Sequence, residues 1–169
     1  MVLFWSATKG LAAACLLHAC QENKVELTAP VAEVWPEFAQ AGKQHVTIAQ
    51  LLSHQAGLAA LATPTPVMDH EAVAAALAAS APAWPLGEGH GYHPRTFGFL
   101  VDETLRRITR GRTLREYWCS EFAEPLGLEV WIGLPPERVH EPASIFPAKN
   151  SPPKGDPFYV AFLTPSSLT

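Results

Sequence analysis

The first long apolar stretch predicts a core helix over residues 6–22, SATKGLAAACLLHACQE. Alanine and leucine dominate this stretch, and it contains no proline, so its helix propensity is high. From Leu11 to Ala19 it is apolar on nearly all sides, which is typical of a helix enclosed by the rest of the protein. Ser6 is a good candidate for the N-cap, because a serine hydroxyl accepts hydrogen bonds from backbone N–H groups at a helix start. Lys9 is the exception, a charged residue at the head of a stretch predicted to be buried.

Four further stretches have apolar residues at helical spacing, with capping or stop residues at most of their ends. They are residues 46–58, 69–80, 95–109 and 113–128. Thr47 is the predicted cap of the first and Gly57 its stop, while Asp69 is the predicted cap of the second. The third is amphipathic and follows a long turn-rich loop over residues 81–94. Its predicted apolar face consists of Phe97, Leu100, Val101, Leu105 and Ile108.

Helical periodicity is lost after residue 129. Half of the 16 prolines fall between positions 135 and 169, and FYVAFL at 158–163 is the only good strand candidate. The fold class is therefore predicted as mainly α. We expect one domain over residues 1–135, followed by a proline-rich, poorly structured segment at 136–169.

Composition and charge exclude several classes of partner. The 12 basic and 16 acidic residues give a net charge of −4, and no basic cluster appears, so a nucleic-acid partner is not expected. No run of about 18 uncharged apolar residues exists, so no membrane-spanning helix is predicted. His90 and His93 form an H-x-x-H pattern without a third ligand, and we predict no metal and no cofactor. Small molecules remain as the expected partners.

The cysteines bear on the compartment. Cys15, Cys20 and Cys119 have neither metal-ligand spacing nor the pattern of a disulfide framework, which favours a reducing, cytoplasmic environment. The alternative is a lipoprotein signal that ends at LHAC, with Cys20 as the lipidated residue. The position of Lys9 inside the apolar stretch, rather than before it, argues against a signal peptide. If the alternative holds, the mature product is a small helical lipoprotein without Ser6 and Lys9.

Ser6 and Lys9 form an S-x-x-K pattern, and residues at i and i+3 of a helix lie side by side. A serine hydroxyl is a weak nucleophile until a base takes its proton. A neutral lysine can be that base, but its ordinary pKa of about 10.4 would have to fall by roughly 3 units, which burial can supply. The pattern alone is also compatible with an N-cap serine beside a surface lysine.

Five blocks in register make the pattern more specific. They are FWSATKG, QENKVELTAPVAEVWPEF, VTIAQLLSHQAGL, GYHPRTFGFLVDE and EFAEPLGL. Together they resemble the beta-lactamase-related serine hydrolases, a family of class C beta-lactamases, esterases and penicillin-binding-type peptidases. The resemblance covers about residues 2–135. It implies the helical portion of an α+β beta-lactamase/transpeptidase-like fold, with most of the antiparallel sheet missing from this chain.

The resemblance also implies roles for individual residues. Ser6 falls on the acyl-forming nucleophile, Lys9 on its proton partner, and Tyr92 on the tyrosine that passes the proton to the leaving group and later activates water. His54 falls on a structural position whose ring ties neighbouring backbone together. Trp5 is expected to pack beside Ser6. Glu88 and Asp102 are expected to be a loop carboxylate and a helix-surface charge.

Two departures from the family pattern qualify these roles. Pro94 stands where the family usually has an asparagine two residues after the tyrosine, which argues against efficient beta-lactam turnover and toward ester hydrolysis. The family's first strands and its third motif are absent, so we expect a fragment that is weakly active or inactive alone. The alternative within the same fold is a non-catalytic scaffold or binding protein.

Overall fold

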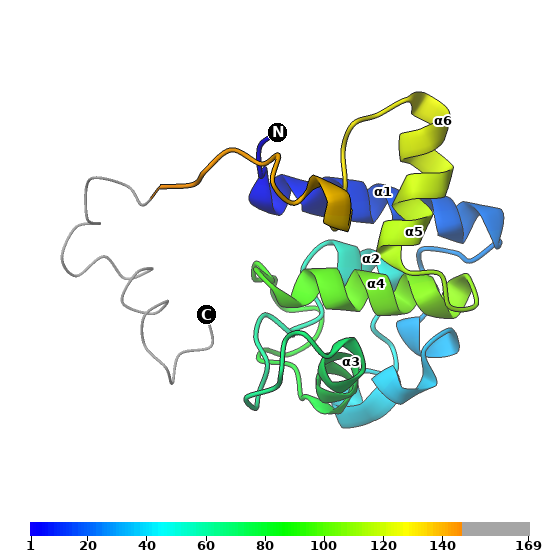
Figure 1. Ribbon diagram of the computed structural model, residues 1–169. Coiled ribbons are helices and arrows are strands. Elements are labelled where there is room, and N and C mark those ends of the chain that lie inside the picture. Colours follow the sequence, from blue (N-terminus) through cyan, green and yellow to red (C-terminus); the bar gives the residue numbers. More distant parts are fainter. Residues whose placement is uncertain (147–169) are drawn as a thin grey trace.

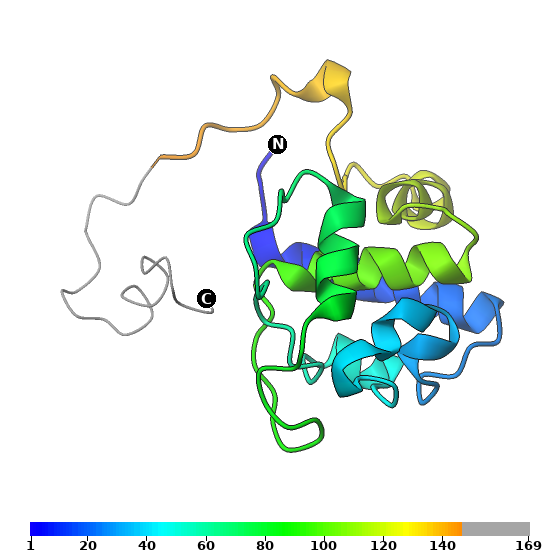
Figure 2. The ribbon, with the colours of Figure 1, turned by 90° about the horizontal axis from the view of Figure 1, so that it is seen from below.

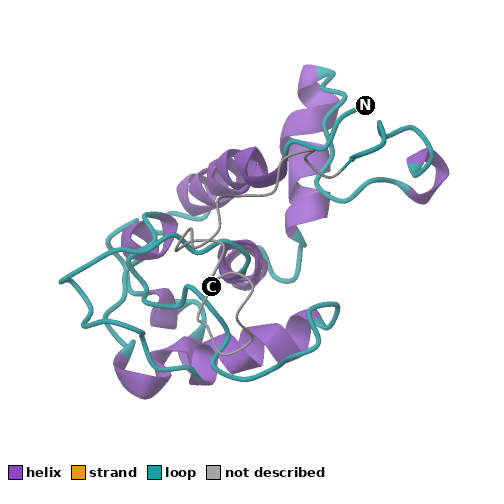
Figure 3. Cartoon of the chain, turned by 90° about the vertical axis from the view of Figure 1, so that its left-hand side faces the viewer, coloured by secondary structure: helices purple, strands orange, loops and turns teal. Residues whose placement is uncertain are grey.

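The computed structural model describes residues 1–146, and this part of the chain is helical. Its α-helices are connected by loops and short 3₁₀ turns, and its only β-type pairing is an isolated bridge between Pro30 and Thr47 (Figure 3). The helix-rich architecture confirms the mainly α prediction. The strand predicted at 158–163 lies outside the described residues, and the domain boundary at 135 stays a prediction.

Helix α1, Thr8–Glu22, is the predicted core helix, and it packs along α4 (Figure 1). A 3₁₀ turn, Trp5–Ala7, precedes it, so Ser6 is not its N-cap: Ala7 occupies that position without a side-chain hydrogen bond. The prediction that the helix is enclosed on nearly all sides is also wrong, because Leu17 is 43% exposed. The buried face consists of Ala12, Cys15, Leu16, Ala19 and Cys20.

Helix α4, Thr96–Ile108, lies between α1 and α3, His70–Ala79, in Figure 1, and α3 crosses it steeply in Figure 2. Both helices confirm the predicted ranges to within a residue. The five apolar residues predicted for the face of α4 are all buried. Asp69 caps α3 as predicted, since its carboxylate accepts the backbone N–H of Ala72 at 3.0 Å.

Helix α2, Ile48–Leu52, is much shorter than the predicted helix at 46–58. Thr47 and Gln50 form a capping box at its start, which confirms the predicted cap. The helix ends because His54 adopts a left-handed backbone conformation with φ +63°. A left-handed residue cannot continue a right-handed helix, so Gly57 is not the stop.

The predicted helix at 113–128 is interrupted. It consists of α5, Leu114–Trp118, a π-helical turn, Cys119–Ala123, and α6, Glu124–Leu126. Pro125 lies inside α6, and Gly127 follows the helix as its C-cap with φ +62°. This segment crosses α1 in the right-hand half of Figure 1.

A buried lysine connects two parts of the helical core. Lys43 is fully buried, and its amine donates to the carbonyls of Gln40 at 2.7 Å, Ala78 at 2.9 Å and Ser80 at 2.5 Å. Burial lowers the pKa of this amine. The three carbonyls belong to the turn before Lys43 and to the C-terminal end of α3, where cations are favoured.

A charged cluster lies on the α4 side that faces α3. Glu103 accepts from Arg107 at 2.7 Å and contacts His70 at 2.9 Å. Burial raises the pKa of the Glu103 carboxyl, but the hydrogen bonds with Arg107 and then His70 outweigh it, so its pKa is lowered. Asp102 is more than the predicted surface charge, because it accepts the backbone N–H of Leu114 at 2.6 Å and so ties α5 to α4.

No helix among residues 1–146 is both long and apolar enough to cross a lipid bilayer. Cys15, Cys20 and Cys119 are free thiols. Cys15 and Cys20 are buried in the core, and burial raises their pKa values to about 12 and about 11. Neither thiol is therefore poised as a thiolate nucleophile.

Candidate active site

The N-terminal ends of α1 and α4 lie at the same end of the molecule, on the left in Figure 1. This arrangement brings the Ser6–Lys9 turn beside the loop that precedes α4. Ser6 is exposed in its 3₁₀ turn, and Lys9 is half-buried one turn further on. The Lys9 amine donates to the Ser6 hydroxyl oxygen at 3.0 Å. Because Ser6 does not cap the helix, its hydroxyl faces the lysine instead.

Tyr92 meets this pair from the loop before α4. The Lys9 amine lies 4.9 Å from the centroid of the Tyr92 ring. The Ser6 hydroxyl and then the Lys9 amine, both close to the Tyr92 phenol, lower its pKa below the ordinary value of 10.0. The three residues singled out from the sequence are therefore brought together, although 83 positions separate Lys9 from Tyr92 in the chain.

Pro94 supplies a contact that the sequence gives no sign of. Its backbone carbonyl accepts a hydrogen bond from the Lys9 amine at 2.8 Å. The amine is therefore held from two sides, by the Ser6 hydroxyl and by this carbonyl. Every residue carries such a carbonyl, so no residue type in the sequence signals this contact.

The Tyr92 loop is held by two histidines and a tryptophan. The His54 ring accepts the backbone N–H of His93 at 3.2 Å, in keeping with the structural role that the resemblance implies. A Cβ added to Gly91 would lie 2.8 Å from the Trp84 ring, so the loop passes against this indole too closely for a side chain. His93 is fully buried and His90 is exposed. Among residues 1–146, no group of three His, Cys, Asp or Glu side chains could hold a metal ion.

Glu88 and Trp5 are both expected to have no catalytic role, and the structure agrees with the expected surroundings of only one of them. Glu88 is an exposed loop residue, as expected. Trp5 does not pack beside Ser6, because it is 71% exposed and has φ +46°. The Thr8 hydroxyl donates to the Trp5 carbonyl at 2.6 Å and holds this unusual turn from the first residue of α1.

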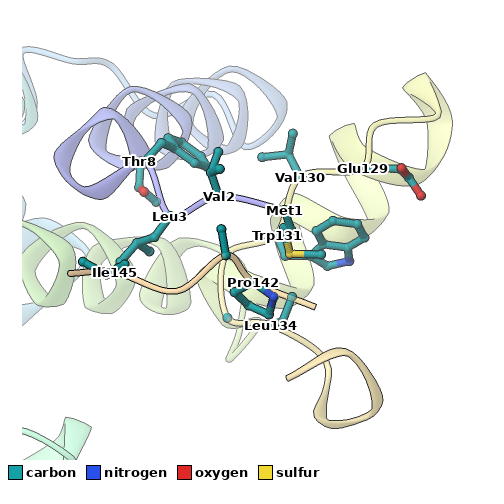
Figure 4. A pocket seen from close by; sticks show the side chains of 13 residues that line it. Met1, Val2, Leu3, Thr8, Glu129, Val130, Trp131, Leu134, Pro142 and Ile145 are labelled. Atoms are coloured by element: carbon teal, nitrogen blue, oxygen red, sulfur yellow. The ribbon is translucent and has the colours of Figure 1, made fainter. Parts of the chain in front are cut away.

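An apolar pocket of about 640 Å³ borders the segment that carries Ser6 (Figure 4). Residues 1–4 and Thr8 form one side of it, and residues between 129 and 145 form the other. The backbone N–H of Ala143 donates to the Met1 carbonyl at 2.8 Å and joins the two sides. In Figure 4 the side chains of Leu3, Trp131 and Leu134 gather around this space, so an apolar group would fit it best.

The sequence profile of the Beta-lactamase family matches residues 1–166. The chain belongs to the Beta-lactamase family. Among curated proteins of this family, it is 37% identical over 137 residues to "Esterase/beta-lactamase LipL" of Mycobacterium tuberculosis (strain ATCC 25618 / H37Rv). That match covers 79% of this chain and 32% of LipL, so the chain spans about a third of the length of this relative.

Solved structures agree with the family assignment. A penicillin-binding protein homologue from Caulobacter crescentus superposes with a TM-score of 0.80 at 42% identity, covering 88% of this chain and 40% of the homologue. A family VIII carboxylesterase gives 0.79 at 38% identity, with 84% and 40% covered. EstA from Arthrobacter nitroguajacolicus Rue61a gives 0.78 at 37% identity, with 90% and 42% covered. The helices described above are thus the helical portion of the beta-lactamase/transpeptidase-like fold.

Proposed function

We propose that this chain carries the nucleophile and proton-transfer groups of a serine ester or amide hydrolase that works through an acyl-enzyme. Ser6 attacks the acyl carbon of a small-molecule substrate while Lys9, as the neutral amine, takes the hydroxyl proton. That proton passes from Lys9 through Tyr92 to the leaving alcohol or amine as the bond to the leaving group breaks. Tyr92 then takes a proton from the water that hydrolyses the acyl-enzyme.

The observation that carries this proposal is the meeting of three groups at one helix start. The Lys9 amine lies 3.0 Å from the Ser6 hydroxyl and 4.9 Å from the Tyr92 ring centroid. A phenol with a lowered pKa is phenolate in a larger fraction of molecules near neutral pH than an ordinary tyrosine is. The phenolate is the form that accepts a proton. Membership of a family whose relatives are named esterase, carboxylesterase and beta-lactamase supports the same chemistry.

Pro94 favours esters over beta-lactams. Its backbone carbonyl accepts from Lys9, but its side chain has no carboxamide N–H groups to donate to a substrate amide oxygen. An ester substrate with a good leaving group depends less on such a donor. We therefore propose carboxylic esters as the better substrates.

Labelling with a fluorophosphonate probe tests the proposal, because the probe phosphonylates an activated serine. We expect mass spectrometry to locate the probe on Ser6 and Ser6→Ala to abolish labelling. Lys9→Met and Tyr92→Phe should slow labelling by about 100-fold or more, the usual contribution of a general base. Ser53→Ala is the matched control: Ser53 is also an exposed serine at a helix end, and labelling should be unchanged.

The same experiment separates the alternatives. A folded sample that stays unlabelled at Ser6 would favour the non-catalytic scaffold or binding protein. The intact mass of the mature chain decides the lipoprotein alternative, since cleavage before Cys20 would remove Ser6 and Lys9. Until it is measured, cytoplasmic location and the lipoprotein both stay predictions. Because the chain spans only about a third of LipL, we propose weak activity for it, with labelling slower than in a full-length relative.

A further inference from the structure

His93 makes three hydrogen bonds in a fully buried site beside Tyr92. Its Nε2 accepts the backbone N–H of Leu58 at 3.0 Å, and its Nδ1 lies 2.6 Å from the Gly91 carbonyl. A ring nitrogen that accepts carries no proton, and one that faces a carbonyl must carry one. The contacts therefore fix His93 as a neutral imidazole protonated on Nδ1. Its backbone N–H donates in turn to the His54 ring.

His54 also binds this loop, through both its ring and its backbone. Its Nδ1 accepts the N–H of His93 at 3.2 Å, and its carbonyl accepts the N–H of Gly91 at 3.1 Å. Both residues that flank Tyr92 in the chain are thus bound to His54. The His54 ring centroid also lies 5.1 Å from that of Tyr92. The φ of +63° at His54 is a strained conformation that this network maintains.

His93 Nε2 accepts the N–H of Leu58, and His54 Nδ1 accepts the N–H of His93. A proton added to either ring nitrogen would point at that backbone N–H, and the hydrogen bond would be lost. The titratable groups that face the pair are Lys9 from α1 and Tyr92 from the loop itself. The other neighbours are neutral rings, Phe97 from α4 at 4.8 Å from His54 and Trp84 at 5.9 Å from His93. No carboxylate hydrogen-bonds to either ring among residues 1–146, so nothing there compensates a positive charge.

The direction of the pKa shifts agrees with this geometry. Burial lowers the pKa of both imidazoles, and the Lys9 charge lowers that of His54 further. For His93, the Gly91 carbonyl opposes the shift, while His54 adds to it. A base with a lowered pKa in the folded state costs stability as pH falls through its ordinary value of 6.5 toward its folded value. Above pH 6.5 both rings are neutral in either state, and the attachment is complete.

We propose that His54 and His93 are positioning residues, a neutral imidazole pair that holds Tyr92 against Lys9 and releases the Tyr92 loop when it is protonated. The structural part of this proposal stands on the hydrogen bonds alone. Its catalytic consequence rests on the proposed function of Ser6, Lys9 and Tyr92. The pair would make hydrolysis sensitive to acid independently of the protonation of the reacting groups themselves.

NMR of the histidine rings in the intact chain tests the structural part without any activity. We expect a neutral His93 with its proton on Nδ1 and a midpoint below 6.5 for both rings, accompanied by a change in the Trp84 environment. Exposed His45 is the reference. A His93 protonated on Nε2 when neutral, or a midpoint at or above that of His45, would overturn the proposal.

The pH profile of Ser6 labelling tests the catalytic consequence. One protonation in the reacting group lowers the rate about tenfold per pH unit, and each imidazole should add about another tenfold per unit below its own midpoint. His93→Gln keeps an acceptor for Leu58, and His54→Asn keeps an acceptor for His93 and tolerates a positive φ. In each variant the extra tenfold dependence of the replaced ring should disappear, because an amide does not titrate, while the remaining imidazole keeps its own. His45→Gln should leave the profile unchanged.

The outcomes separate the two proposals. His93→Phe removes both ring hydrogen bonds and should slow labelling at pH 7.5 by at least tenfold, while His93→Gln should recover most of that loss. An unchanged profile in both amide variants would refute the positioning role even where Ser6 is labelled. If the rings titrate as expected and Ser6 stays unlabelled at every pH, the proposed function fails while the imidazole pair stands.

Discussion

Lys43→Met is expected to destabilise the helical core by about 3 kcal/mol. The amine is fully buried and makes three hydrogen bonds to backbone carbonyls, and methionine can replace none of them. Leaving a buried acceptor unpaired costs about 1–3 kcal/mol each. The apolar side chain of methionine returns roughly 2 kcal/mol by burial, and removal of a buried charge offsets part of the loss.

Thermal and urea unfolding followed by far-UV circular dichroism measure this loss. For a chain of this size, about 3 kcal/mol corresponds to a fall in Tm of roughly 6–12 °C. Lys24→Met is the control, since Lys24 is exposed and its replacement should change the free energy of unfolding by less than about 0.5 kcal/mol. If Lys43→Met and Lys24→Met unfold alike, the three carbonyls are satisfied without the amine and the reasoning is wrong.

Three further predictions concern the site and the charged cluster. Gly91→Ala should slow Ser6 labelling at least tenfold, because its Cβ would lie 2.8 Å from an indole ring, whereas Gly89→Ala, at 3.6 Å, should stay within about twofold. Pro94→Asn should increase acylation by a fluorescent penicillin relative to fluorophosphonate labelling, since it adds a carboxamide N–H and keeps the backbone carbonyl; equal rates would count against the ester preference. Glu103 has a lowered pKa in the folded state, so its contribution to stability is present above its ordinary value of 4.5 and is lost as pH falls through the lowered value. Glu103→Gln should therefore be less stable at pH 7, with a flatter dependence of urea unfolding on pH below 4.5.

The long, periodic elements of the fold are predictable from the sequence. Helices α3 and α4 begin and end within a residue of their predicted bounds, because capping residues and apolar spacing are local signals. The end of α2 is not predictable in this way. It depends on His54, whose ring and backbone are bound by Gly91 and His93, residues far along the chain. Local patterns contain no information about such contacts.

In the candidate site, too, only the contacts between residues close in the sequence are predictable from local patterns. Ser6 and Lys9 are three residues apart, so helical spacing alone places them together. Tyr92 required the resemblance to a family, since no local pattern connects it to Lys9. Lys43 gave no signal, because an isolated lysine in a turn is ordinarily a solvated side chain.

Pro94 shows why a departure from a family pattern has to be judged by atoms rather than by residue types. An asparagine side chain offers one acceptor and two donor hydrogens, and a proline side chain offers neither. The Lys9 amine nevertheless finds its acceptor 85 positions away in the carbonyl of Pro94 at 2.8 Å. In the proposed mechanism, Lys9 thus keeps an acceptor that orients its amine, and only a donor that would face a substrate is missing. On that proposal the residue at position 94 affects the choice of substrate rather than the chemistry. The carbonyl can do this only where the loop is held in place, because moving it by 1 Å would break the hydrogen bond to Lys9. The same restraints on residues 91–93 therefore serve both Tyr92 and the acceptor for Lys9.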